Sequence, residues 1–136
     1  MDAQAWKELN EALRDARDAK RAAGAARQLH EKATAEDIPR LMEMLKDRDF
    51  FIREAAAWPL AELAGLGALP QLLVALQRTF DDGHDGDGFQ TALIELVELD
   101  KPAARQVLNE LLKAGDKGIR ENAMWLLEFC ETAPGA

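Results

Sequence analysis

Hydrophobic residues recur every three or four positions along most of this chain. The spacing is clear in residues 38–45, IPRLMEML, and again in residues 69–76, LPQLLVAL. Such spacing places one apolar stripe along a helix. No segment shows sustained alternation of apolar and polar positions with β-branched residues, so no sheet is expected. The pattern therefore predicts an all-α protein.

Capping and turn residues divide the chain into about seven helices. Thr34 followed by Asp37 resembles a capping box, and Pro102 suits a first helical turn. Paired glycines mark the turns near residues 65–67 and 115–118. Residues 1–20 are amphipathic and are expected to form an extra N-terminal capping helix, with one apolar face made of Ala5, Trp6, Leu9 and Leu13.

The chain repeats itself at intervals close to one helix pair. A shift of 31 positions places Leu29 on Leu60 and Pro39 on Pro70. A shift of 67 positions superimposes the IRE tripeptide of residues 52–54 on that of residues 119–121. A third, weaker copy lies between them, shifted by 37 positions. The extra length falls in residues 80–88, an acidic, glycine-rich stretch that is expected to be an insertion between two helices.

The repeat resembles HEAT repeats, including short bacterial units related to those of phycobilisome-lyase subunits. Two segments carry the resemblance, LKDRDFFIREAAAWPLAEL at residues 45–63 and LKAGDKGIRENAMWLLEF at residues 112–129. In each, an acidic turn residue precedes an aliphatic–Arg pair that opens a helix. The resemblance covers roughly residues 20–131, although the third unit has Gln90 in place of the arginine.

This resemblance implies a short right-handed α-solenoid forming a single domain over residues 1–136, with 132–136 as a flexible tail. Each helix pair buries its apolar face only against its neighbours. The second helix of each unit is expected to line a concave surface. The side chains expected there are mixed in sign, as suits protein recognition: Glu36, Arg40, Glu43, Gln71, Arg78, Arg105, Asn109 and Lys113.

Residues that recur at equivalent positions are expected to be structural, because recurrence favours a role in the scaffold. The arginines of the repeat should bond turn carbonyls or aspartates between stacked units, and its tryptophans should pack in the core. The residues concerned are Asp49, Arg53, Trp58, Asp116, Arg120 and Trp125.

Composition indicates a soluble globular protein: of 136 residues, 48% are hydrophobic and 31% charged. No uninterrupted apolar run approaches the roughly 18 residues of a membrane span, and the N-terminus lacks the apolar core of a signal peptide. The single Cys130 cannot form an internal disulfide. These features predict a cytoplasmic protein without a membrane partner.

The net charge of −8 is concentrated in one segment, because residues 79–100 contain seven acidic residues and no lysine or arginine. This placement argues against binding of nucleic acid through that face, which needs a basic surface. It favours a protein partner with a basic surface.

The centre of this segment is FDDGHDGDGFQ, residues 80–90. We expect it to be a recognition loop, since fold stability offers no reason for such charge density, and we expect Asp87 to cap the following helix. A flexible turn without a role and a weak Ca²⁺ site remain alternatives; the EF-hand pattern fails at Gly83 and Ala92. The residues expected to contact the partner are Asp81, Asp82, His84, Asp85, Arg78, Arg105 and Asn109.

No catalytic motif is present, and we expect neither a metal nor a cofactor. His30 stands alone, and Cys130 is expected to be a small core residue. The sequence thus predicts a non-catalytic protein-binding module. Its most concrete form is a small bacterial immunity protein that neutralises a basic toxin. The alternatives are an adaptor or assembly scaffold, a lyase-accessory subunit and a Ca²⁺-responsive module.

Overall fold

The computed structural model describes residues 1–131, so the predicted tail at 132–136 lies outside the described residues. The described part contains helices and turns and no strand, which confirms the all-α prediction. It has eight α-helices, one more than the pattern suggested: α1 (Ala3–Leu13), α2 (Ala19–Lys32), α3 (Ile38–Met44), α4 (Phe50–Ala64), α5 (Leu69–Asp81), α6 (Asp87–Leu99), α7 (Lys101–Ala114) and α8 (Lys117–Leu127).

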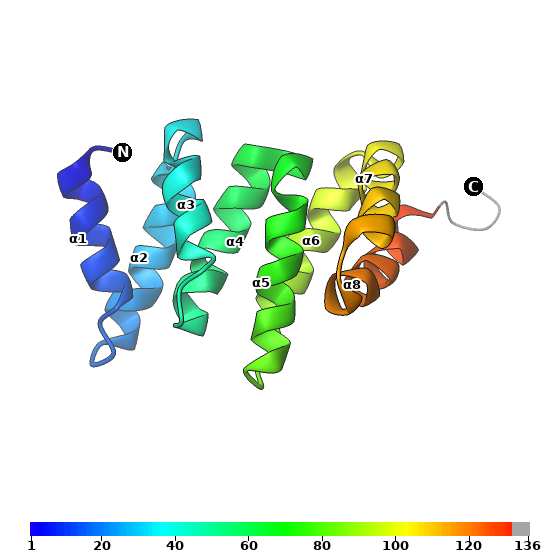
Figure 1. Cartoon of the computed structure of the whole chain (residues 1–136). Coiled ribbons are helices and arrows are strands. Elements are labelled where there is room, and N and C mark those ends of the chain that lie inside the picture. The colour runs from blue at the N-terminus through cyan, green and yellow to red at the C-terminus, as the bar shows by residue number, and fades with distance from the viewer. Residues whose placement is uncertain (132–136) are drawn as a thin grey trace.

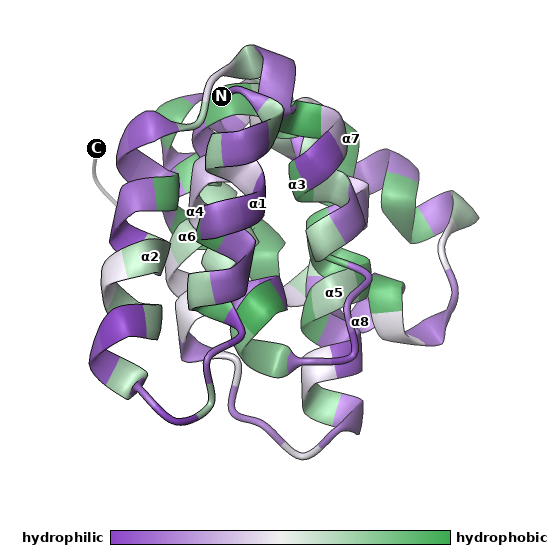
Figure 2. Cartoon of the chain, turned by 90° about the vertical axis from the view of Figure 1, so that its left-hand side faces the viewer, coloured by the Kyte–Doolittle hydropathy of each residue, from purple (hydrophilic) through white to green (hydrophobic). Residues whose placement is uncertain are grey.

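The helices form two rows (Figure 1). Helices α2, α4 and α6 pack side by side in one row, and each packs against its sequence neighbour in the other row, which contains α1, α3 and α5. Seen along the array, hydrophobic stretches lie toward the middle of the molecule and the connecting loops are largely hydrophilic (Figure 2). The arrangement is the short α-solenoid that the repeats predict.

The C-terminal hairpin departs from this regular stacking. Helix α8 packs mainly against α7 and α5, and makes little contact with α6. The side chain of Asn122 on α8 donates to the amide oxygen of Gln77 on α5 at 3.0 Å. Gly118 allows the close approach, because a Cβ atom there would lie 2.8 Å from Gln77 Cγ. The expectation that α7 continues the row of α3 and α5 is therefore wrong; α8 takes that place.

Aspartates begin most of the helices by accepting a hydrogen bond from a backbone N–H of the first turn. Residues 1–20 contain two such starts, because Asp2 caps α1 and Asp18 caps α2. They are therefore one helix, α1, followed by a turn and the first residues of α2, and not a single helix. The other helices begun in this way are capped by Asp49, Asp100 and Asp116.

Helix α4 is the centre of the core. It packs against α2, α3, α5 and α6, and seven of its residues are buried. An 18-residue window within Phe50–Asp81 has a mean hydropathy of 1.5, a value that a membrane span could also show. In the structure this stretch is two helices, α4 and α5, joined by the 3-10 segment Gly65–Ala68, and half of the window is buried. Its apolar character therefore comes from the core of a folded repeat.

Candidate functional site

Arg53 of α4 links two turns of the structure through hydrogen bonds. Its side chain is fully buried. One terminal nitrogen, Nη1, donates to the carbonyl oxygens of Asp47 at 2.9 Å and Arg48 at 3.1 Å in the preceding turn. The other, Nη2, donates to the carboxylate of Asp82 at 3.1 Å. Arg53 therefore joins the turn before α4 to the end of α5.

The acidic segment thus contributes to stability through Asp82. This carboxylate also lies 3.9 Å from Nε of Arg78, whose Nη1 donates to the Lys46 carbonyl oxygen at 2.8 Å. We expected the charges of this segment to contribute nothing to fold stability, and this expectation is wrong for Asp82. Both Asp82 and Arg78, two of the residues expected to contact a partner, hold neighbouring repeats together.

Three other residues of the loop that were expected to contact a partner, Asp81, His84 and Asp85, are exposed and make local contacts. Asp81 accepts from the side-chain amide of Gln77 at 2.8 Å, and Asp85 accepts from the backbone N–H of Asp87 at 3.1 Å. The imidazole of His84 stacks on the ring of Phe50, with centroids 4.2 Å apart. Asp87 is the first residue of α6 and Gly86 precedes it in a left-handed conformation, so the predicted cap at Asp87 is wrong.

The two recurring motifs have different environments. Asp49 and Asp116 each cap their own helix. Arg120, however, is exposed, and no hydrogen bond or ion pair of its side chain occurs among residues 1–131. The predicted equivalence of Arg53 and Arg120 is therefore wrong in three dimensions.

The two tryptophans also differ, but here the second copy packs on the core. Trp125 packs against the core and meets Phe129 edge-on, with ring centroids 5.4 Å apart. Trp58 lies half-buried at the surface, outside the hydrophobic core, contrary to the prediction. Its indole Nε1 donates to Glu62 at 2.8 Å, and its ring lies edge-on to His30 at 5.9 Å.

Trp58 divides a groove that runs over the row of α2, α4 and α6. On one side is a hollow of about 200 Å³ between α4 and α6. On the other is a hollow of about 310 Å³ between α2 and α4, closed by Gly88 of α6. The sequence reasoning missed this groove. Two features of the sequence could have indicated the groove: Glu62 follows Trp58 by four residues, and a leucine, Leu99, is the last residue of α6. The side chain of Leu99 is 82% exposed.

Negative charge gathers along the groove. The carboxylate of Glu54 packs against Gly88, at the start of α6. Partial burial and the nearby charges of Asp85 and Asp87 raise the pKa of Glu54 above its usual value. For Glu62, burial alone would raise the pKa, but hydrogen bonds from His30 and Trp58 outweigh it and lower the pKa. The distance between Oε2 of Glu62 and Nε2 of His30 is 2.9 Å.

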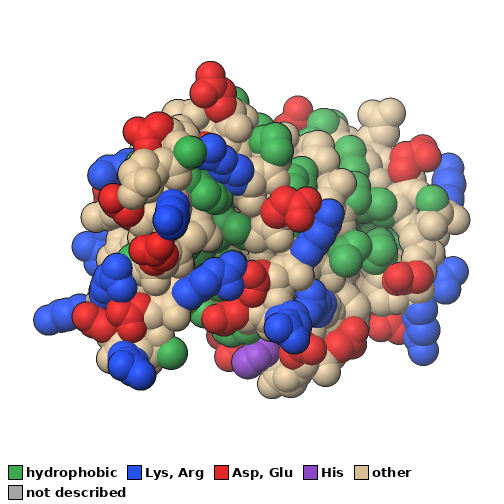
Figure 3. All heavy atoms as spheres, turned by 60° about the vertical axis from the view of Figure 1, so that its left-hand side comes forward, with side chains coloured by type: hydrophobic (Ala, Val, Ile, Leu, Met, Phe, Trp, Pro, Cys, Tyr) green, Lys and Arg blue, Asp and Glu red, His purple; other side chains and the backbone are tan. Residues whose placement is uncertain are grey.

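Of the seven carboxylates in residues 79–100, the one at Asp82 forms ion pairs, and none of the other six pairs with a basic side chain among residues 1–131. Elsewhere acids and bases are interspersed, as one side of the molecule shows in Figure 3. The acidic segment is therefore the part of the described surface where negative charge is least neutralised by basic side chains of the same chain.

Arg105 and Asn109, expected on the concave face, lie on α7 away from the row of α3 and α5. The guanidinium of Arg105 donates to the Cys130 carbonyl oxygen at 2.5 Å and so fastens α7 to the chain after α8. Asn109 is exposed.

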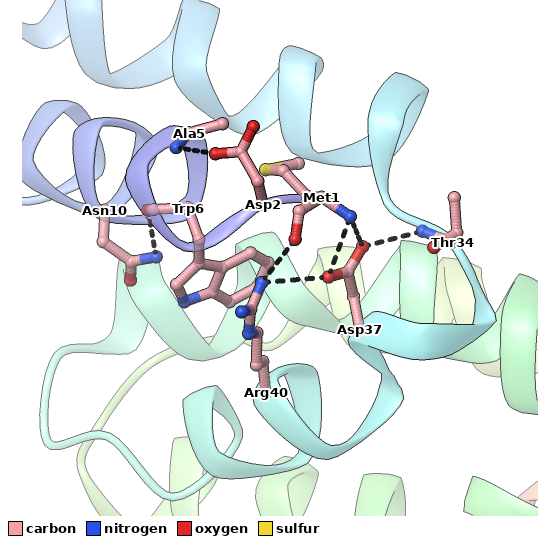
Figure 4. Close-up of polar contacts among 8 residues, drawn as sticks. All are labelled: Met1, Asp2, Ala5, Trp6, Asn10, Thr34, Asp37 and Arg40. Carbon is pink, nitrogen blue, oxygen red and sulfur yellow. Dashed lines mark hydrogen bonds and ion pairs between the residues drawn. The ribbon is translucent and has the colours of Figure 1, made fainter.

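A second buried polar cluster lies at the N-terminal end (Figure 4). Asp37, 1% exposed, accepts from the N-terminal ammonium group at 3.3 Å, the Thr34 backbone N–H at 2.9 Å and Arg40 at 3.2 Å. The guanidinium of Arg40 also lies 5.1 Å from the centre of the Trp6 ring. The cluster joins α1 to α3 and has a stabilising role.

The described residues contain no group of three metal-ligating side chains close enough to hold an ion. Cys130 is fully buried, and burial raises the pKa of its thiol, which favours the unreactive protonated form.

A family model for HEAT repeats matches residues 7–90, more than half of the chain. The match begins within α1 and ends in the first turn of α6, before the hairpin that leaves the regular stacking. No curated protein and no solved structure matches the chain. HEAT repeats commonly mediate contacts between proteins and are generally scaffolds without catalytic activity. By repeat pattern, stacking and sequence match, the chain belongs to the HEAT-repeat family.

Proposed function

We propose that this HEAT-repeat protein binds a partner protein with a basic surface and catalyses no reaction. The unbalanced charge of residues 79–100 carries the proposal, since one of the seven carboxylates there is neutralised by a basic side chain of the described residues. A basic partner would supply the missing counter-charges and would be attracted over a distance of about 10 Å at moderate salt.

Within this class we favour a small cytoplasmic bacterial protein that neutralises its partner, in the manner of an immunity protein for a basic toxin. The size of the chain and its net charge of −8 support this form. An adaptor that assembles a basic protein into a complex would use the same surface. The two forms differ in their consequence: an immunity protein abolishes the activity of its partner, and an adaptor preserves it.

The experiment is a selection of random peptides on the immobilised protein. The matched control is the variant Asp81→Asn, Glu95→Gln, Glu98→Gln, which removes three charges and keeps Asp82 paired with Arg53. We expect the wild type to enrich peptides rich in lysine and arginine, and the variant to lose this enrichment while keeping its far-UV circular dichroism. Equal enrichment by both proteins, or peptides without a basic excess, would overturn the proposal.

A further inference from the structure

The hollow between α4 and α6 has an apolar floor and acidic rims. Its floor includes Ala61 and Trp58 of α4 and Ala92 and Leu96 of α6. Glu62 stands on one wall and Glu95 on the other. On α6 the lining residues are 92, 95, 96 and 99, the spacing of one helix face.

We propose that this groove receives an amphipathic, basic α-helix of the partner protein. The inference rests on the proposed function and adds the form of the bound segment. The apolar face of the incoming helix would lie over Trp58, Leu96 and Leu99, and lysine or arginine side chains on its two flanks would meet Glu62 and Glu95. Recognition of a helix in a groove characteristically uses apolar anchors spaced three or four residues apart, flanked by charge.

The apolar part of the groove is already prepared for contact. The hydrogen bond from Trp58 Nε1 to Glu62 fixes the indole, so little side-chain freedom is lost when it is covered. Tryptophan is also the residue type that most often dominates binding energy at interfaces. Leu99, 82% exposed, offers a second apolar surface at the end of α6, where burial by a partner removes it from water.

The charge of the groove specifies the flanks of the incoming helix. Glu95 and the neighbouring exposed Glu98 have no basic partner among residues 1–131, and α6 contains no lysine or arginine. At the other end, partial burial and the nearby charges of Asp85 and Asp87 raise the pKa of Glu54. The bases that line the groove are Arg27 and His30 of α2, and Nε2 of His30 lies 2.9 Å from the Glu62 carboxylate, whereas Glu95 has no such neighbour. A cation entering between α4 and α6 would therefore relieve repulsion.

The dimensions suit a helix of three to four turns. Helix α6 has 13 residues, which corresponds to a length of about 20 Å. An incoming helix of similar length would reach from Leu99 to the acidic end near Gly88. The described part of the chain has no sheet edge to which an extended peptide could add.

The test uses three synthetic peptides of about 14 residues. The first has leucines on one helical face and lysines on the others; the second contains the same residues in an order without a hydrophobic face; the third replaces each lysine of the first by glutamate. Binding is measured by fluorescence anisotropy of labelled peptide. We expect the first peptide to bind at least about tenfold more tightly than the second, and the third not to bind.

Four variants locate the peptide. Leu99→Ser and Trp58→Ala should each weaken binding of the first peptide about tenfold or more. Glu62→Gln with Glu95→Gln should weaken binding and make its salt dependence shallower. The matched control is Val74→Ser on α5, which changes a residue 52% exposed on the other row and should leave binding unchanged. The Leu99 side chain contributes little to the core. We therefore expect Leu99→Ser to leave the fold intact, so that its effect reports on binding alone.

Different results separate this inference from the proposed function. If the two lysine peptides bind equally and Leu99→Ser has no effect, the groove does not receive a helix, although a basic partner is still recognised. If Val74→Ser weakens binding, the site lies on the other row, which also overturns the inference. If the protein forms dimers that Leu99→Ser abolishes, the groove is occupied by a second copy. If neither lysine peptide binds, both proposals fail.

Discussion

Replacing Arg53 by alanine tests whether equivalent positions of the repeat carry equivalent roles. Arg53 is fully buried and has three hydrogen-bond acceptors, on Asp47, Arg48 and Asp82. Arg120 occupies the matching sequence position but is exposed. We expect Arg53→Ala to lower the free energy of unfolding far more than Arg120→Ala does.

The magnitude follows from the contacts that are lost. Without Arg53, two carbonyl oxygens in the turn before α4 lose a charged donor, and such a hydrogen bond contributes about 1.5–3 kcal/mol. Two buried methylene groups beyond Cβ add about 0.8 kcal/mol each. The carboxylate of Asp82 is 44% exposed, so its ion pair contributes about 1 kcal/mol at most. Arg53 Nε is buried without an acceptor, so its removal is favourable and offsets part of the loss. We expect a net decrease of about 3–5 kcal/mol.

The assay is urea denaturation monitored by far-UV circular dichroism. The free energies of unfolding are compared with the dependence on urea concentration, the m value, held equal for all variants. Arg120→Ala should remain within about 0.5 kcal/mol of the wild type, as is usual for a substitution at the surface. Asp82→Asn should cost about 1 kcal/mol or less, because an amide oxygen still accepts from Arg53. A small effect of Arg53→Ala, or an equal effect of Arg120→Ala, would show that the buried tether does not stabilise the array.

Three further substitutions test a buried carboxylate, a turn and a helix interior. Burial alone would raise the pKa of Asp37, but the Thr34 N–H and the N-terminal ammonium group outweigh it and hold the pKa below its usual value. The stability that this carboxylate adds is therefore present above about pH 4 and lost as the pH falls further. Asp37→Asn should lower stability at pH 7 and flatten its decline in acid; parallel pH profiles of the melting temperature would contradict this. Gly86 has φ of 74°, and a Cβ atom there would lie 3.0 Å from Leu76 Cδ1, so Gly86→Ala should cost about 1–2 kcal/mol. Gly24→Ala, in the open interior of α2, should instead stabilise by about 0.5–1 kcal/mol in the same denaturation assay, and a loss there would contradict the environment assigned to Gly24.

The positions of the helices could be predicted from the sequence because they depend on local chemistry. Apolar spacing in residues 38–45 and 69–76 defines one buried face per helix, and both segments are helical in the structure. Aspartates before the helices provide the first hydrogen-bond acceptors. Repetition of these signals along the chain is sufficient to indicate the HEAT family, since the family is defined by the repeat itself.

The sequence also contained a misleading signal, the repetition of residues 52–54 at 119–121. Identical residues suggested identical roles, but burial depends on what is stacked beside a helix. Arg53 is enclosed by the turn before α4 and by the end of α5. Around Arg120, by contrast, no neighbouring turn among residues 1–131 supplies an acceptor to the side chain. The tryptophans differ in the opposite direction, because Trp125 of the second copy packs on Phe129 and the core while Trp58 of the first copy borders the groove.

The candidate site was predicted in part, because charge is a property of composition and position is a property of packing. The excess of acid in residues 79–100 is visible in the sequence. Which of those carboxylates form ion pairs depends on the three-dimensional structure. The buried Arg53, 29 positions before Asp82, pairs with Asp82, and Glu95 has no basic partner among residues 1–131. The sequence by itself determined the helices, the repeat and the net charge, since these follow from neighbours along the chain. The tertiary structure alone decided the place of α8 beside α5 and the groove at Trp58, because both depend on contacts between helices that are distant in sequence.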